Sequence, residues 1–160
     1  MPPLRTVLAG LVRGRGVKDP RVDESLELLD LAAMCDEQPT NLSLGQRKLV
    51  GVARALVARP RLLCLDEPAA GLDASESRIL GERLRQVVDG GTTTLLIDHD
   101  MNLVLSVSDY VYVLDFGRII AHGTPAEIRV DEAVIQAHLG RTDPTSPGHR
   151  SEVVGEGALP

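Results

Sequence analysis

Hydrophobic positions recur at helical spacing over the first 58 residues of the chain. An apolar segment predicts a helix over residues 4–12, and a stripe of apolar positions predicts a second helix from about residue 23. A third helix is predicted over residues 44–58, with Ser43 as its N-cap. The positions expected to face inward are Val22, Leu26, Leu29 and Ala33 in the second helix and Leu49, Val52, Ala53 and Leu56 in the third. Residues 1–58 are therefore predicted to form a helical subdomain.

After residue 60 the pattern changes to short apolar runs that alternate with helical segments. The runs predict strands at residues 62–65, 92–97, 110–114 and 119–121. The first two suit strands that are buried on both faces of a parallel sheet. Helices are predicted at residues 75–88 and 100–106, and from a capping box at 124–127 to about residue 139. In the helix over 75–88, the residues expected to face inward are Ile79, Leu80, Leu84, Val87 and Val88.

Strands that alternate with helices, after a helical block, predict an α/β fold. Residues 59–140 are expected to form the parallel-sheet half of this fold. Residues 141–160 are rich in Pro, Gly and Ser, and we expect them to form a disordered tail.

Composition excludes several classes of protein. The net charge of −6 does not suit a nucleic-acid partner, because such proteins neutralise phosphates with basic side chains. Two cysteines make no disulfide framework and favour a reducing, cytosolic compartment. No apolar run approaches the roughly 20 residues of a membrane span, so we expect any membrane role to require a partner.

The segment Leu42–Gln46 places a serine and a glycine at the start of the third predicted helix. A helix N-terminus offers free N–H groups and the positive end of the helix dipole, so Ser43 and Gly45 could admit a phosphate. The same segment also suits an ordinary N-cap with no ligand.

Carboxylates follow two of the predicted strands. Asp66 and Glu67 end the first, and Asp98 and His99 end the second, so both pairs are expected at the carboxyl edge of the sheet. In phosphoryl transfer, an Asp there holds Mg²⁺ and a neighbouring Glu orients or deprotonates the attacking water. The alternatives are carboxylates that cap the following turn and a histidine with a structural role.

The order of these segments resembles the ATP-binding subunits of ATP-binding cassette (ABC) transporters. Residues 42–46 resemble the signature motif, residues 62–67 Walker B, residues 69–73 the D-loop, and His99 the switch histidine. The resemblance implies a P-loop NTPase-like cassette fold and the cofactors ATP and Mg²⁺.

The resemblance also implies a role for each matching residue. Ser43, Gly45 and Gln46 would contact the ATP that is bound to a partner subunit. Asp66 would serve Mg²⁺, Glu67 the attacking water and His99 the γ-phosphate. Asp73 would help to couple the two ATP sites.

Further segments are similar to the ATPases of branched-chain amino acid uptake. They are Asp66–Leu72, Asp98–Met101, Asp115–Ala121, Gly123–Glu127 and Val134–Gly140. This similarity implies a second ATP-binding subunit and transmembrane permease subunits as partners, and a position on the cytoplasmic face of the plasma membrane.

The chain departs from the family in lacking a Walker A motif. That motif requires Gly-x-x-x-x-Gly-Lys-Ser/Thr, and neither Lys18 nor Lys48 follows a glycine. The Gln of the Q-loop is missing as well, so the chain is expected to be the C-terminal part of a cassette. Smaller departures are Leu44 in the signature segment and Asp98 before the histidine.

Three hypotheses follow for the function. The first is an ATP-hydrolysing subunit of an ABC importer, which the retention of Glu67 and His99 favours. The second is a non-catalytic module that donates the signature helix to a complete cassette, which the missing Walker A motif favours. The third is a truncated product without a function of its own. The family's P-loop strand lies inside the sheet, so the strands at 62–65 and 92–97 are expected to lack a neighbour and to present an exposed apolar edge, and with it marginal stability or obligate association.

Overall fold

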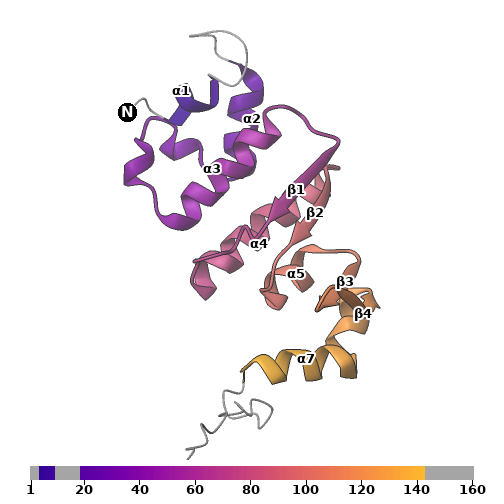
Figure 1. Cartoon of the computed structure of the whole chain (residues 1–160). Coiled ribbons are helices and arrows are strands. Elements are labelled where there is room, and N and C mark those ends of the chain that lie inside the picture. Colours follow the sequence, from indigo (N-terminus) through magenta and orange to yellow (C-terminus); the bar gives the residue numbers. More distant parts are fainter. Residues whose placement is uncertain (1–3, 10–18, 143–160) are drawn as a thin grey trace, which may run out of the picture. The chain divides into compact units, whose positions relative to one another are not determined.

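The computed structural model describes residues 4–9 and 19–142, and the chain divides into two compact units (Figure 1). One unit extends to Asp109 and the other begins at Tyr110. The prediction of a disordered tail over 141–160 is wrong for residues 141 and 142, which are helical. Residues 143–160 of that tail and residues 10–12 of the first predicted helix lie outside the described residues. The predicted boundary between residues 58 and 59 stays a prediction.

The first unit begins with a helical block. Its elements are α1 (Leu4–Ala9), α2 (Pro20–Leu28), the 3-10 turns η1 (Ala32–Met34) and η2 (Pro39–Asn41), and α3 (Leu44–Leu56). Helix α2 starts earlier than predicted because the Asp19 carboxylate accepts the Arg21 N–H at 3.0 Å and Pro20 suits the first helical position. The helix ends at Leu28, so the predicted stripe does not reach Ala33, which is exposed.

Helix α3 follows the prediction closely. The Ser43 side chain accepts the Gln46 N–H, and the Gln46 side chain accepts the Ser43 N–H, which forms a capping box. The predicted stripe of Leu49, Val52, Ala53 and Leu56 is buried. The side chains of this stripe belong to one core that also contains residues of α1, α2, α4, α5 and β1.

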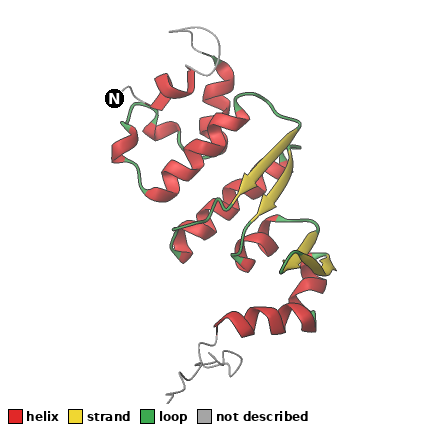
Figure 2. Cartoon of the chain, viewed as in Figure 1, coloured by secondary structure: helices red, strands yellow, loops and turns green. Residues whose placement is uncertain are grey.

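A parallel pair of strands and two helices complete the first unit. These elements are β1 (Leu62–Asp66), α4 (Ala74–Asp89), β2 (Thr93–Ile97) and α5 (Met101–Val107). Strands β1 and β2 are parallel, with Leu62 opposite Thr93 and Asp66 opposite Ile97, as predicted. Figure 2 shows the two strands beside helix α4.

The prediction that these strands are buried on both faces is wrong. Leu63 is 3% exposed and belongs to the core that α4 and α5 share, whereas Leu62, Leu95 and Ile97 are 53–57% exposed. Successive strand residues point to opposite faces of a sheet, and only one face of this pair meets helices among the described residues. The inward position predicted for Ile79 is also wrong, because this side chain is 40% exposed.

The second unit is an antiparallel hairpin followed by two helices. Its elements are β3 (Val111–Asp115), β4 (Arg118–Gly123), α6 (Pro125–Val130) and α7 (Glu132–Thr142). The predicted capping box at 124–127 is present, and its hydrogen bonds hold the pKa of the Glu127 carboxyl below its ordinary value. The single helix predicted to residue 139 is broken at Asp131, where the backbone is extended.

No helix among residues 4–9 and 19–142 is long and apolar enough to cross a membrane.

Candidate nucleotide-contact and catalytic residues

The start of α3 brings together the backbone and side-chain groups predicted to contact phosphate. The Ser43 Oγ atom accepts the Gln46 N–H at 3.2 Å, which fixes the serine at the helix N-terminus. The Gly45 N–H donates to the Glu76 Oε1 atom at 3.2 Å. Ser43 is exposed, whereas Gly45 is buried by the Glu76 side chain and the surrounding residues.

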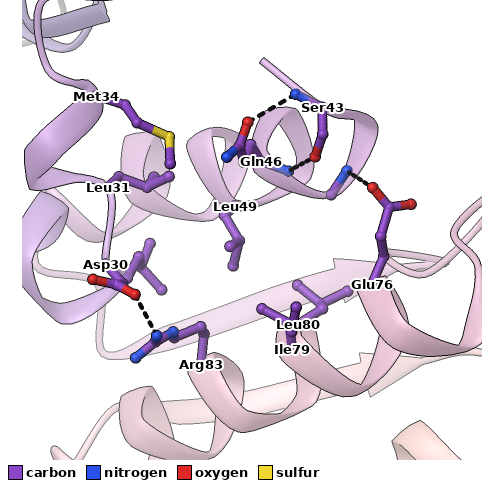
Figure 3. Close-up of a pocket in the computed structure, with 12 residues that line it drawn as sticks. Asp30, Leu31, Met34, Ser43, Gln46, Leu49, Glu76, Ile79, Leu80 and Arg83 are labelled. Carbon is purple, nitrogen blue, oxygen red and sulfur yellow. Dashed lines mark hydrogen bonds and ion pairs between the residues drawn. The ribbon is translucent and has the colours of Figure 1, made fainter.

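A pocket of about 180 Å³ adjoins this helix start, between α3 and α4 (Figure 3). Its apolar wall consists of Leu29, Leu31, Met34, Leu49, Ile79 and Leu80. Polar groups of Asp30, Ser43, Gly45, Gln46, Glu76 and Arg83 complete the lining. The Arg83 guanidinium forms an ion pair with the Asp30 carboxylate at 2.6 Å. The residues predicted to contact phosphate, Ser43, Gly45 and Gln46, therefore line this pocket.

The second candidate cluster lies at the carboxyl ends of β1 and β2. The Glu67 N–H donates to the Ile97 carbonyl at 2.8 Å, which joins the two strand ends. Glu67 has a φ of 44°, a left-handed backbone conformation that is uncommon for residues other than glycine. The Asp66 and Glu67 side chains both belong to exposed residues, so a ligand could reach them.

Glu67 and His99 are brought together as the sequence predicts. The His99 Nδ1 atom lies 3.8 Å from the Glu67 Oε1 atom and 3.6 Å from the Asp98 Oδ1 atom. These distances exceed those of hydrogen bonds, so the three side chains are neighbours without being hydrogen-bonded to one another. The side chains of His99 and Glu67 are 72% and 59% exposed.

Asp98 has a structural role that its place in the sequence does not reveal. Its side chain is completely buried. One carboxylate oxygen accepts the Ala69 N–H at 3.0 Å, and the other accepts the Asp100 N–H at 3.0 Å. Asp98 thus fixes the loop after β1 to the loop after β2. Its position directly before His99 was visible in the sequence, but its partner 29 residues away was not.

Asp100 connects helix α5 to helix α4. Its carboxylate accepts the N–H groups of Asn102 and Leu103 and the Ser77 hydroxyl, the last at 2.6 Å. Burial raises the pKa of the Asp100 carboxyl, but these hydrogen bonds outweigh burial and lower it below the ordinary value. The sequence signal for this role is an Asp directly before a helical segment.

Asp73 caps helix α4, with its Oδ1 atom accepting the Ser75 N–H at 2.8 Å and the Glu76 N–H at 2.9 Å. The predicted site residues therefore lie in three groups: the start of α3, the ends of β1 and β2, and the start of α4. The coupling role of Asp73 stays a prediction, as do the ligand contacts of the other residues.

The residues present fit Mg²⁺ only in part. No group of three or more His, Cys, Asp or Glu residues within the described part of the chain could hold a metal ion. Asp66 offers one exposed carboxylate at the end of β1. Mg²⁺ commonly binds one or two carboxylates and takes its remaining ligands from water and substrate phosphates, so a single carboxylate is compatible with Mg²⁺ held on a nucleotide.

The chain matches two protein families. Residues 5–70 match the ABC transporter family, and residues 118–144 match the family described as branched-chain amino acid ATP-binding cassette transporter. The chain is also similar to the high-affinity branched-chain amino acid transport ATP-binding protein LivG of Salmonella typhimurium, with 43% identity over 116 residues. That match covers 72% of this chain and 46% of LivG.

Two more relatives extend the comparison. The sulfate/thiosulfate import ATP-binding protein CysA 2 of Agrobacterium fabrum is 37% identical over 153 residues, covering 92% of this chain and 45% of that protein. A crystal structure of an ATP-binding cassette of an ABC transporter, in its ADP conformation, superposes with a TM-score of 0.73 and 27% identity. It matches 88% of this chain and 63% of its own. The chain thus spans about half the length of the curated relatives that it matches.

Proposed function

Because this chain belongs to the family of ABC transporter ATP-binding subunits, we propose that it acts in an ATPase that drives solute import. The observation that carries the proposal is the pairing of two predicted motifs at one sheet edge. There the Glu67 carboxylate and the His99 imidazole lie 3.8 Å apart at the ends of neighbouring parallel strands. An acid and a base so placed suit the positioning of a phosphate and an attacking water.

The start of α3 is proposed to contact the phosphates of ATP that is bound to a second subunit. The helix dipole and the N–H groups of its first turn favour an anion, and Ser43 and Gln46 add a hydroxyl and an amide. Gly45 has no side chain to separate its N–H from a phosphate oxygen.

The ends of β1 and β2 are proposed to serve hydrolysis. Asp66 would hold Mg²⁺, which, when bound, neutralises charge on the phosphates. The Glu67 carboxylate orients the attacking water and accepts its proton, and the His99 imidazole donates a hydrogen bond to the γ-phosphate. Asp73, at the start of α4, is proposed to couple the two ATP sites.

The solute and the partners belong to the same proposal. The similarity to LivG and to the branched-chain amino acid cassette family supports import of a branched-chain amino acid. The partners are then a second ATP-binding subunit and transmembrane permease subunits, and the chain lies at the cytoplasmic face of the plasma membrane.

One observation favours a second candidate function. Neither Lys18 nor Lys48 belongs to a Walker A motif, so this stretch of chain does not supply the lysine that holds the ATP phosphates. A non-catalytic module would pair with a complete cassette and supply the start of α3 to the ATP bound there. Glu67 would then have no role in hydrolysis.

Replacing Glu67 by Gln separates these two functions. The amide cannot accept a proton from water, so we expect ATP turnover of the reconstituted transporter to fall by about 100-fold or more. Nucleotide binding should change little, because the substitution keeps the shape of the side chain. The measurement is steady-state ATP hydrolysis, with Glu24→Gln on the exposed surface of α2 as the control.

An unchanged turnover in the Glu67→Gln complex would contradict the catalytic role of this residue and favour the non-catalytic module.

A further inference from the structure

An acidic side chain already occupies the helix start at which the proposed function places a phosphate. Glu76 reaches from the first turn of α4 to the first turn of α3, where its Oε1 atom accepts the Gly45 N–H at 3.2 Å (Figure 3). The two residues are 31 positions apart in the sequence. A carboxylate oxygen and a phosphate oxygen can both accept this N–H group. Both are negatively charged, and the N-terminus is the positive end of the helix dipole.

The position of Glu76 is fixed by the segment that precedes it. Asp73 accepts the Glu76 N–H at 2.9 Å, so the first turn of α4 is held in place. A Cβ atom added to Gly71, whose φ is 80°, would lie 3.4 Å from a methyl carbon of Leu44. The segment from Gly71 to Glu76 therefore lies close to the start of α3, with Leu44 near Gly71 and Gly45 hydrogen-bonded to Glu76.

The space around Gly45 is matched to this contact. A Cβ atom added to Gly45 would lie 3.3 Å from the Glu76 Oε1 atom and 3.5 Å from the Glu76 Cβ atom. The first distance is tighter than most contacts of a Cβ atom and the second is an ordinary van der Waals contact, so a side chain at position 45 would require the Glu76 carboxylate to shift by a few tenths of an ångström. Because Gly45 has no side chain, the Glu76 carboxylate can approach the Gly45 N–H closely, and so could a phosphate.

We infer that Glu76 is a positioning residue whose carboxylate holds the Gly45 N–H until a phosphate displaces it. This inference rests on the proposed function, which places the phosphate at Gly45. The carboxylate keeps the N–H satisfied and the helix start in place while no nucleotide is bound. It also competes with the phosphate for the same donor, so only an anion that binds strongly enough opens the contact.

The test is a titration of the full chain with inorganic phosphate, followed by NMR through the amide signal of Gly45. In Glu76→Gln, the amide oxygen can still accept the Gly45 N–H, but the negative charge is gone. We expect this variant to bind phosphate about three- to tenfold more tightly than the unchanged chain, as the free energy of a charge at a helix N-terminus implies. Glu82→Gln, on the exposed surface of the same helix, should bind phosphate as the unchanged chain does.

Equal phosphate affinities in the Glu76→Gln and unchanged chains, with the Gly45 signal moving in both, would overturn the competition and leave the phosphate role of Gly45 intact. A Gly45 signal that phosphate moves in neither protein would overturn the inference together with the phosphate contact in the proposed function. Because the same spectra report the folding of each variant, loss of structure would be recognised directly.

Discussion

At the scale of single residues, Asp98 shows how a buried side chain supports a pair of exposed ones. Its buried carboxylate accepts one N–H from the loop after β1 and one from the loop after β2. The exposed side chains of Glu67 and His99 stand on these two loops. The buried Asp98 side chain therefore helps to set the spacing of two exposed side chains.

Replacing Asp98 by Ala removes the acceptor of both N–H groups. We expect the free energy of unfolding to fall by about 2–4 kcal/mol, because buried donors without acceptors are costly. Urea denaturation of the full chain measures this change. Asp36→Ala, at an exposed position, should cost no more than about 0.5 kcal/mol. Equal losses in the two variants would show that the Asp98 contacts contribute nothing.

The local contacts of the candidate site could be predicted from the sequence, and the distant ones could not. Ser43 was predicted as an N-cap because a cap and its partner lie within one helical turn. The partners of Gly45 and Ala69 lie 31 and 29 residues away, so only the folded chain brings Glu76 and Asp98 to them. The pairing of Glu67 with His99 was predictable because parallel strands end at the same edge.

At the scale of elements, the Ser77–Asp100 hydrogen bond connects two helices through a cap. Ser77 is buried in α4, and Asp100 caps α5 with the same carboxylate that accepts the Ser77 hydroxyl. The hydrogen bonds favour the charged carboxylate in the folded chain, so its pKa is lower when folded than when unfolded. The stability they contribute is present above the unfolded pKa and is lost as the pH falls through the folded pKa.

The variant Ser77→Ala tests this coupling. At pH 7 we expect it to lower the free energy of unfolding by about 1–2 kcal/mol. The difference from the unchanged chain should shrink once the pH falls below about 4, the ordinary pKa of an Asp carboxyl, because the unfolded chain then binds a proton more readily than the folded chain, in which the Asp100 pKa is lowered. Denaturation curves between pH 7 and pH 3 measure both effects. Ser75→Ala, on the exposed first turn of α4, is the matched control, and a difference that stays constant with pH would contradict the coupling.

Helices and strands whose sequence signals lie within the element itself were predicted correctly. The errors arose where contacts with other parts of the chain determine burial or the end of a helix. The type of each helix and strand in 44–123 follows the sequence pattern, because caps, turns and periodicity lie within each segment. Burial of β1 and β2 was predicted wrongly because an apolar run does not reveal what covers it. The break at Asp131 was missed because residues on both sides of it favour a helix.

At the scale of the whole molecule, apolar side chains on one face of the β1–β2 pair meet solvent. Leu62, Leu95 and Ile97 are each more than half exposed, and the parallel register places Leu95 beside Cys64. Exposed apolar strands of this kind promote association between chains. The marginal stability expected from the sequence stays a prediction.

We expect the purified chain to associate in proportion to its concentration, and the double variant Leu62→Thr, Leu95→Thr to associate less. Threonine suits a strand and presents a hydroxyl to water, so the sheet should persist while the apolar face shrinks. Light scattering over a tenfold range of concentration measures the association. Val130→Thr, at an exposed apolar position on the second unit, should behave as the unchanged chain does. A monodisperse monomer before substitution would contradict this expectation.

The left-handed backbone at Glu67 has a consequence for any attempt to engineer this protein. For a residue with a side chain, a φ of 44° costs about 1 kcal/mol or more, whereas glycine adopts this backbone conformation freely. A library screened only for thermal resistance would therefore enrich glycine at position 67 and discard the carboxylate. Directed evolution for robustness and directed evolution for ATP turnover would diverge at this residue first, because the backbone favours one outcome and the proposed chemistry the other.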